Sequence, residues 1–149
     1  MWIKRKAARI AWPFLLPLNS GINPNAVMVI HKTFSDFVLY LYIHIAYADG
    51  RLHADEERVI LEKMNRHFPI EGDHKARYDQ RVKEYENINK PLHHEIIKAS
   101  FLHFDHIKFS QRYKIYADMY DIIHADGKVD ESETRAVNEL KEIIDLLAQ

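Results

Sequence analysis

Two segments of this sequence repeat one pattern, and the repeat limits the folds that the chain can adopt. The letters ADGRLHADEER at residues 48–58 and ADGKVDESETR at residues 125–135 align without a gap, 77 residues apart. Each copy contains Ala-Asp-Gly, five variable residues and Glu, and each lies between two stretches with helical periodicity. The repeat therefore predicts two helical hairpins related by a pseudo-twofold axis.

The apolar side chains of the chain recur every three or four positions over long stretches, and no useful stretch alternates with period two. We therefore expect an all-α fold, a compact bundle of about six helices in which two helices lie between the two hairpins. Residues 1–25 form a basic and apolar N-terminal arm, and residues 26–149 form a single helical domain. The expected helices span residues 26–48, 54–67, 73–88, 91–104, 110–125 and 130–148.

Composition excludes several classes of function. The chain has no cysteine, which removes disulfides, thiolate metal sites and cysteine nucleophiles. The first 35 residues carry five basic residues and no acid, so the remainder, with 16 basic and 22 acidic residues, has a charge of −6. A nucleic-acid-binding domain is usually basic over its folded part, so we expect no nucleic-acid partner. The sequence has no Gly-x-Ser-x-Gly elbow, no phosphate loop and no His-Glu-x-x-His helix, and we expect no enzymatic activity.

Ordinary turn chemistry accounts for much of the repeated corner. Gly50 and Gly127 can adopt the left-handed conformation that ends a helix. The apolar residues two positions later, Leu52 and Val129, can fill the gap between the two helices of a hairpin. Asp130 and Glu133 have the spacing of a capping box, in which each side chain binds a free backbone N–H of the next helix.

The two aspartates of the repeat are harder to explain in this way. Asp49 and Asp126 fall at helix C-termini, where the helix dipole disfavours an acid. A side-chain bond to the turn, a bound divalent cation (Ca²⁺, Mg²⁺ or Mn²⁺) or a basic protein partner would each offset that cost. An ordinary EF-hand is not expected, because its first ligand positions fall on Ile45 and Ile122. The candidate oxygen ligands are Asp49, Glu56, Asp126, Asp130 and Glu133.

The N-terminal arm combines basic and aromatic residues: Trp2, Lys4, Arg5, Lys6, Arg9 and Trp12. Its apolar part is too short to span a bilayer, which takes about 18 or more residues. Three readings stay open: a secretory signal, a segment that binds a membrane surface or a partner, and an arm packed on the body. The second reading makes the chain a scaffold or co-chaperone-like interaction domain, which is the alternative to cation binding.

With its two Ala-Asp-Gly-x5-Glu corners, the sequence resembles the TerB-like family of tellurite-resistance helical domains over roughly residues 26–147. The matching positions are Asp49, Gly50, Glu56, Asp126, Gly127 and Glu133. The resemblance implies an all-helical fold of two pseudo-symmetric repeats and a non-enzymatic binding module linked to metal or envelope stress in bacteria. We also expect a protein partner and a cytoplasmic location, either free or peripheral to the inner membrane. His53 departs from the polar or acidic residue usual at that position, which puts the first site in doubt.

Overall fold

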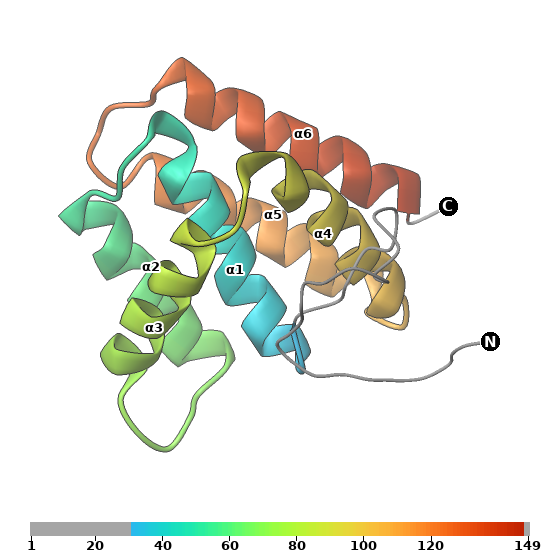
Figure 1. The fold of residues 1–149 in the computed structure, drawn as a ribbon, viewed down its shortest axis with the longest axis horizontal. Coiled ribbons are helices and arrows are strands. Elements are labelled where there is room, and N and C mark those ends of the chain that lie inside the picture. The colour runs from blue at the N-terminus through green and yellow to red at the C-terminus, as the bar shows by residue number, and fades with distance from the viewer. Residues whose placement is uncertain (1–30, 148–149) are drawn as a thin grey trace, which may run out of the picture.

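The computed structural model describes residues 31–147, and within them the chain is helical throughout apart from turns and loops (Figure 1). The predicted arm at residues 1–25 lies outside this range, so the reading of Trp2, Lys4, Arg5, Lys6, Arg9 and Trp12 stays a prediction. The elements are α1 (Phe34–Ala46), the short 3-10 helix η2 (Tyr47–Asp49), α2 (Ala54–His67), α3 (His74–Glu86), α4 (Lys90–His103), α5 (Phe109–Ile123) and α6 (Glu131–Leu147).

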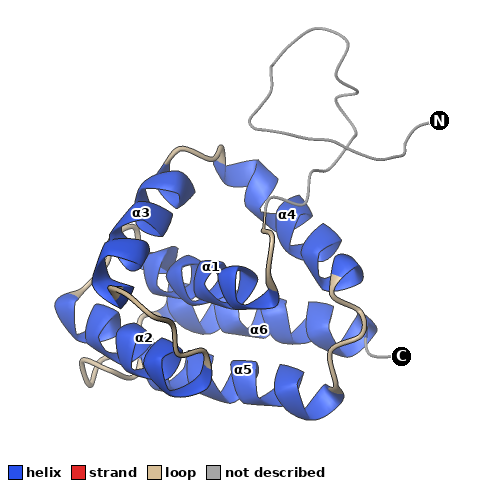
Figure 2. Ribbon diagram, turned by 90° about the horizontal axis from the view of Figure 1, so that it is seen from below, coloured by secondary structure: helices blue, strands red, loops and turns tan. Residues whose placement is uncertain are grey.

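Helix α1 is the centre of the molecule, with α2, α3, α5 and α6 packed around it (Figure 2). It begins at Phe34, later than the predicted residue 26, because Thr33 is extended and its hydroxyl accepts the backbone N–H of Asp36 at 3.1 Å. Nine of its thirteen residues are buried, so the helix has almost no polar face. They are Phe37, Val38, Leu39, Tyr40, Leu41, Tyr42, Ile43, Ile45 and Ala46.

The helices pack as the predicted pseudo-twofold axis requires. Helix α1 packs on α2 within the first hairpin, and α5 packs on α6 within the second. Across the axis, the first helices of the two hairpins, α1 and α5, contact each other. The first helix of each hairpin also contacts the second helix of the other: α1 contacts α6, and α5 contacts α2. Helices α3 and α4 lie between the hairpins in sequence, and they contact α1 and α6 respectively. The predicted all-α bundle of two hairpins with two intervening helices is therefore confirmed.

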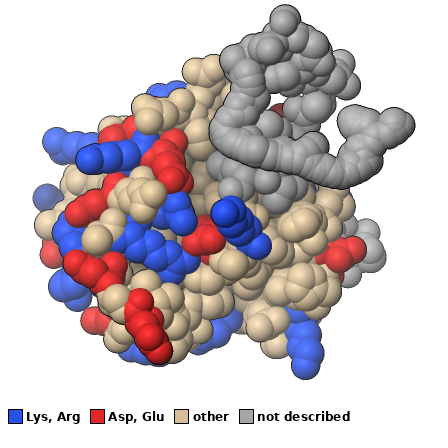
Figure 3. All heavy atoms as spheres, turned by 60° about the horizontal axis from the view of Figure 1, so that its bottom comes forward, with Lys and Arg blue, Asp and Glu red and all other residues tan. Residues whose placement is uncertain are grey.

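Helix α3 is attached by buried side chains, chiefly Tyr78, and also by charges. Arg77 and Arg81 both reach Asp36 on α1, and Lys75 bridges Glu57 on α2. Figure 3 shows lysines, arginines and acids gathered at the left of this face, the side on which α3 lies, while uncharged side chains prevail at the right. Within the described residues, no helix combines the length and the apolar character needed to cross a bilayer.

Candidate binding site at the paired corners

Both repeated corners have the same backbone geometry. The chain leaves the preceding helix through Gly50 with φ of 98° and through Gly127 with φ of 78°, both in the left-handed region that favours glycine. In the first corner the carboxylate of Asp49 accepts the N–H of Arg51 at 3.2 Å, and in the second Asp126 accepts the N–H of Lys128 at 2.9 Å. This bond to the turn offsets the unfavourable helix dipole, so the aspartates need no ligand to explain them.

The glutamates of the repeat begin the next helix in each hairpin. Glu56 Oε1 accepts the N–H of His53 at 3.3 Å, and Glu133 Oε1 accepts the N–H of Asp130 at 3.1 Å. This is half of a capping box, and it satisfies a backbone donor that the helix itself leaves free. Both carboxyl groups are nonetheless buried, with residue exposures of 1% and 3%. Capping alone does not require burial, because most helix N-termini cap in contact with water.

The two buried glutamates meet across the pseudo-twofold axis. Burial, a side-chain hydrogen bond with Glu133 and the charge of Glu133 together raise the pKa of Glu56 to about 9. The negative charge of Asp49 adds to the same effect. With its pKa raised in this way, Glu56 keeps its proton at neutral pH, and that proton lies between the two carboxyl groups. The repeat thus brings one carboxyl group from each copy to a single point.

The outer parts of the corners differ. In the first, His53 turns its imidazole back to Asp49, with Nε2 2.7 Å from Oδ2, and Leu52 packs against the core. In the second, Asp126 is exposed, and Val129 is 40% exposed. The prediction that both apolar residues fill the gap between helices holds for Leu52 and is wrong for Val129.

The predicted ligand set does not come together as a cage. Asp130 caps α6 by accepting the N–H and the hydroxyl of Ser132, and these bonds lower the pKa of its carboxyl. Asp49 and Asp126 are bound to their own turns. In residues 31–147 no three His, Asp or Glu side chains gather closely enough to hold a metal ion. Of the five predicted ligands, the structure brings together Glu56 and Glu133.

A second polar cluster was not found from the sequence. His44 lies on the apolar helix α1, and its Nδ1 is 2.9 Å from the hydroxyl of Tyr85 on α3. The buried His93 on α4 joins the same cluster through Tyr40. A histidine inside an apolar helix is the signal that could have pointed to it. The hydrogen-bonded residues of this cluster are 41 and 53 positions apart in the sequence and lie on different helices. Helical periodicity does not reveal contacts of this range.

Comparison with known proteins gives a family for this chain. No curated protein and no solved structure matches it. A family model described as "Tellurite resistance protein TerB" matches residues 37–149, which is more than half of the chain and includes both corners. The chain therefore belongs to the TerB family, as the paired Ala-Asp-Gly-x5-Glu corners predicted.

Proposed function

We propose that this chain is a non-enzymatic binding module whose glutamate pair exchanges its shared proton for a divalent cation. The observation that supports the proposal is the meeting of Glu56 and Glu133 in a buried place, where the pKa of Glu56 is raised to about 9. A pair of buried carboxyl groups is costly unless a proton or a cation neutralises it. Glutamates that only cap helices can do so in contact with water, without the free-energy cost of burying their carboxyl groups.

The donor set selects the kind of cation. The pair supplies two carboxylates from protein, which is too few for the six to eight oxygen ligands of a calcium loop. Mg²⁺ commonly binds through one or two carboxylates and keeps several waters, and Mn²⁺ accepts the same oxygen ligands. Binding removes the shared proton, so the affinity should rise with pH. Asp49 lies near enough to influence Glu56 and adds negative charge to the site.

The proposed route to the pair is through the corner loops. Gly50 and Arg51 are exposed on one side, and Gly127 and Lys128 are exposed on the other. Because the carboxyl groups themselves are buried, a cation with its waters enters only when these loops move apart. Binding should then change amide hydrogen exchange in residues 49–53 and 126–130 and leave α3 unaffected.

A thermal-shift titration tests the proposal. Wild-type protein at pH 8 is titrated with Mg²⁺, Mn²⁺, Ca²⁺ and Zn²⁺, beside Glu56→Gln and a control, Glu62→Gln, which changes an exposed acid on the same helix. An ion at 100 times its dissociation constant adds about 2.7 kcal/mol, which is on the order of 5–10 °C for this size. We expect this shift with Mg²⁺ or Mn²⁺ in wild type and control, and its loss in Glu56→Gln.

Two results would overturn the cation proposal. One is the absence of a shift with all four ions at 10 mM, and the other is a shift that Glu56→Gln retains. Asp49→Asn combined with Asp126→Asn then tests the other expectation, a basic protein partner. If that double variant folds but loses a partner that wild type binds, the corners are a protein-docking surface.

A further inference from the structure

A cavity of about 300 Å³ lies where the end of α1 meets α3, α4 and the first turns of α6. It is at the small end of the range for ligand pockets, which suits a small molecule. Its lining does not include the glutamate pair, so the proposed function leaves it unused. The lining residues that matter here are His44, Tyr47, Tyr85, Lys90, His93 and Arg135.

Two imidazoles in the lining are held in fixed orientations. His93 is 5% exposed, and its Nδ1 is hydrogen-bonded to the hydroxyl of Tyr40 at 2.5 Å. The Nδ1 of His44 lies 2.9 Å from the hydroxyl of Tyr85. Burial lowers the pKa of both histidines to about 4, so both rings are neutral at pH 7.

The partner of His93 determines which of its nitrogens carries the proton. Tyr40 is buried, and in the described part of the chain its hydroxyl has His93 as its partner. A buried hydroxyl proton without an acceptor is costly, so Tyr40 donates to Nδ1. The proton of the neutral ring then lies on Nε2. His93 therefore has one polar atom left for a ligand, and that atom is a donor.

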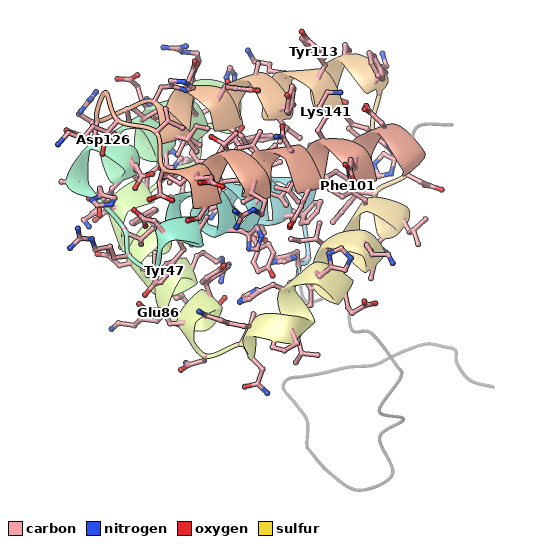
Figure 4. The ribbon with its side chains drawn as sticks, turned by 90° about the horizontal axis from the view of Figure 1, so that it is seen from above. Tyr47, Glu86, Phe101, Tyr113, Asp126 and Lys141 are labelled. Atoms are coloured by element: carbon pink, nitrogen blue, oxygen red, sulfur yellow. The ribbon has the colours of Figure 1, made fainter. Side chains whose placement is uncertain are left out.

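Three aromatic rings lie next to one another beside the cavity; the inner two are stacked, and the outer one is tilted by 31°. The ring of Tyr85 lies 4.1 Å from that of His93, centroid to centroid, with 18° between their planes, and Tyr47 is 5.4 Å from Tyr85. The hydroxyl of Tyr47 donates to Glu86 at 2.6 Å, which anchors the outer ring, and Figure 4 shows these two side chains close together. Offset aromatic rings of this kind offer flat apolar surface to a flat ligand.

The charges in the lining favour an anion. Lys90 and Arg135 contribute two cations against one acid, Glu139. Lys90 has no ion pair with the described residues, and the pair of Arg135 with Glu131, at 3.2 Å, is well exposed and therefore weak. Both cations are thus available to a ligand.

We propose that this cavity binds a small aromatic anion, whose carboxylate or phosphate head contacts Lys90, Arg135 and His93 while its ring packs on Tyr47 and Tyr85. The head would accept the Nε2–H of His93 and charge-assisted bonds from the two cations. The lining shares η2 and the first turns of α6 with the paired corners, but no residue of the glutamate pair.

Binding of simple probes to the full chain tests this proposal. Benzoate, phenyl phosphate, inorganic phosphate and the neutral benzyl alcohol are titrated at pH 7 without divalent cations, with NMR detection of the His44 and His93 imidazoles. Lys90→Gln and Arg135→Gln alter exposed residues, so the fold should survive. Their matched controls are Lys98→Gln on α4 and Lys141→Gln on α6, which lie outside the cavity lining.

We expect benzoate or phenyl phosphate to bind at millimolar concentration or better and to shift the His93 resonances. Each cavity variant should weaken that binding about 3- to 10-fold, which corresponds to roughly 0.6–1.4 kcal/mol, and each control should change it less than twofold. Comparing the two probes shows which head group is preferred. The proposal is overturned if no anion binds below 10 mM, if benzyl alcohol binds as well as benzoate, or if the cavity variants bind like their controls. Inorganic phosphate binding as tightly as phenyl phosphate would overturn the aromatic part.

Discussion

The first and second corners share a sequence motif, yet they meet different surroundings. Both turn through a left-handed glycine, both bind an aspartate to the turn, and both bury a glutamate at the axis. The first corner is partly covered, with Leu52 against the core and an Asp49–His53 contact, whereas residues 126–130 of the second are exposed to water. The residues that form the turn or meet at the axis therefore play the same part in both copies. The residues that face outward differ in burial and contacts between the copies.

The largest expected effect concerns the glutamate pair, which belongs to both corners equally. A carboxyl group whose pKa is raised on folding stabilises the protein less as pH rises above its unfolded value near 4.5. With the pKa of Glu56 raised to about 9, the free energy of unfolding should fall by about 1.4 kcal/mol per pH unit, or up to about 3 kcal/mol between pH 6.5 and 9. Glu56→Gln and Glu133→Gln should each abolish this decline, as measured by urea unfolding.

The acid side of the same profile has a different source. Burial lowers the pKa of His31, His44 and His93 to about 4, so the unfolded chain binds more protons between pH 4 and 6.5. Stability should therefore be lost as pH falls through that window, and the wild-type maximum should lie near pH 6.5. Both glutamine variants should keep this acid limb. An alkaline decline that persists in both variants would show that the corners do not share a proton.

The next effect should separate the corners. Leu52→Ala removes an apolar side chain packed on the core, and we expect a loss of about 2 kcal/mol in the free energy of unfolding. Val129→Ala, at the matching position, removes a side chain that is 40% exposed and should cost less than about 0.5 kcal/mol. Equal losses in urea unfolding would mean that both corners are covered in solution.

The smallest difference between the corners is expected at their glycines. A Cβ at Gly50 or Gly127 would meet no atom within 4 Å, so Gly→Ala at either position adds backbone strain without a clash. At these positive φ values the expected cost is about 1 kcal/mol at each site. Thermal unfolding of the two single variants measures this. A difference above about 1 kcal/mol between them would break the equivalence of the two turns.

Local patterns in the sequence predicted the helices well, and long-range geometry was out of their reach. The predicted range 54–67 coincides with α2, and the ends of α3 to α6 differ by one or two residues. The start of α1 was placed too early, because periodic apolar residues continue upstream of the Thr33 cap. Where apolar periodicity continues past a capping residue, the periodicity alone places the start of the helix too early.

The candidate site was predicted in its residues but not in its geometry. Glu56 and Glu133 were recognised as equivalent, but the meeting of their carboxyl groups depends on how two hairpins cross, which no local spacing encodes. For the same reason Val129 was predicted to be packed like Leu52, because the motif does not show which of the two residues lies against the core. The cavity beside His44 depends on contacts from three further helices and left only the isolated histidine as a signal.

The burial of α1 on every side has a consequence for synthesis. Helix α1 is complete at residue 46, but α5 and α6, which cover it, end at residues 123 and 147. At about 5–20 residues per second, roughly 100 more residues take on the order of 5–20 s to be made. During that interval α2 and α3 cover only part of this helix, and the surface that later packs on α5 and α6 stays exposed. The half-made chain therefore shows apolar surface to the solvent until synthesis reaches the second hairpin, which is the condition under which nascent chains aggregate.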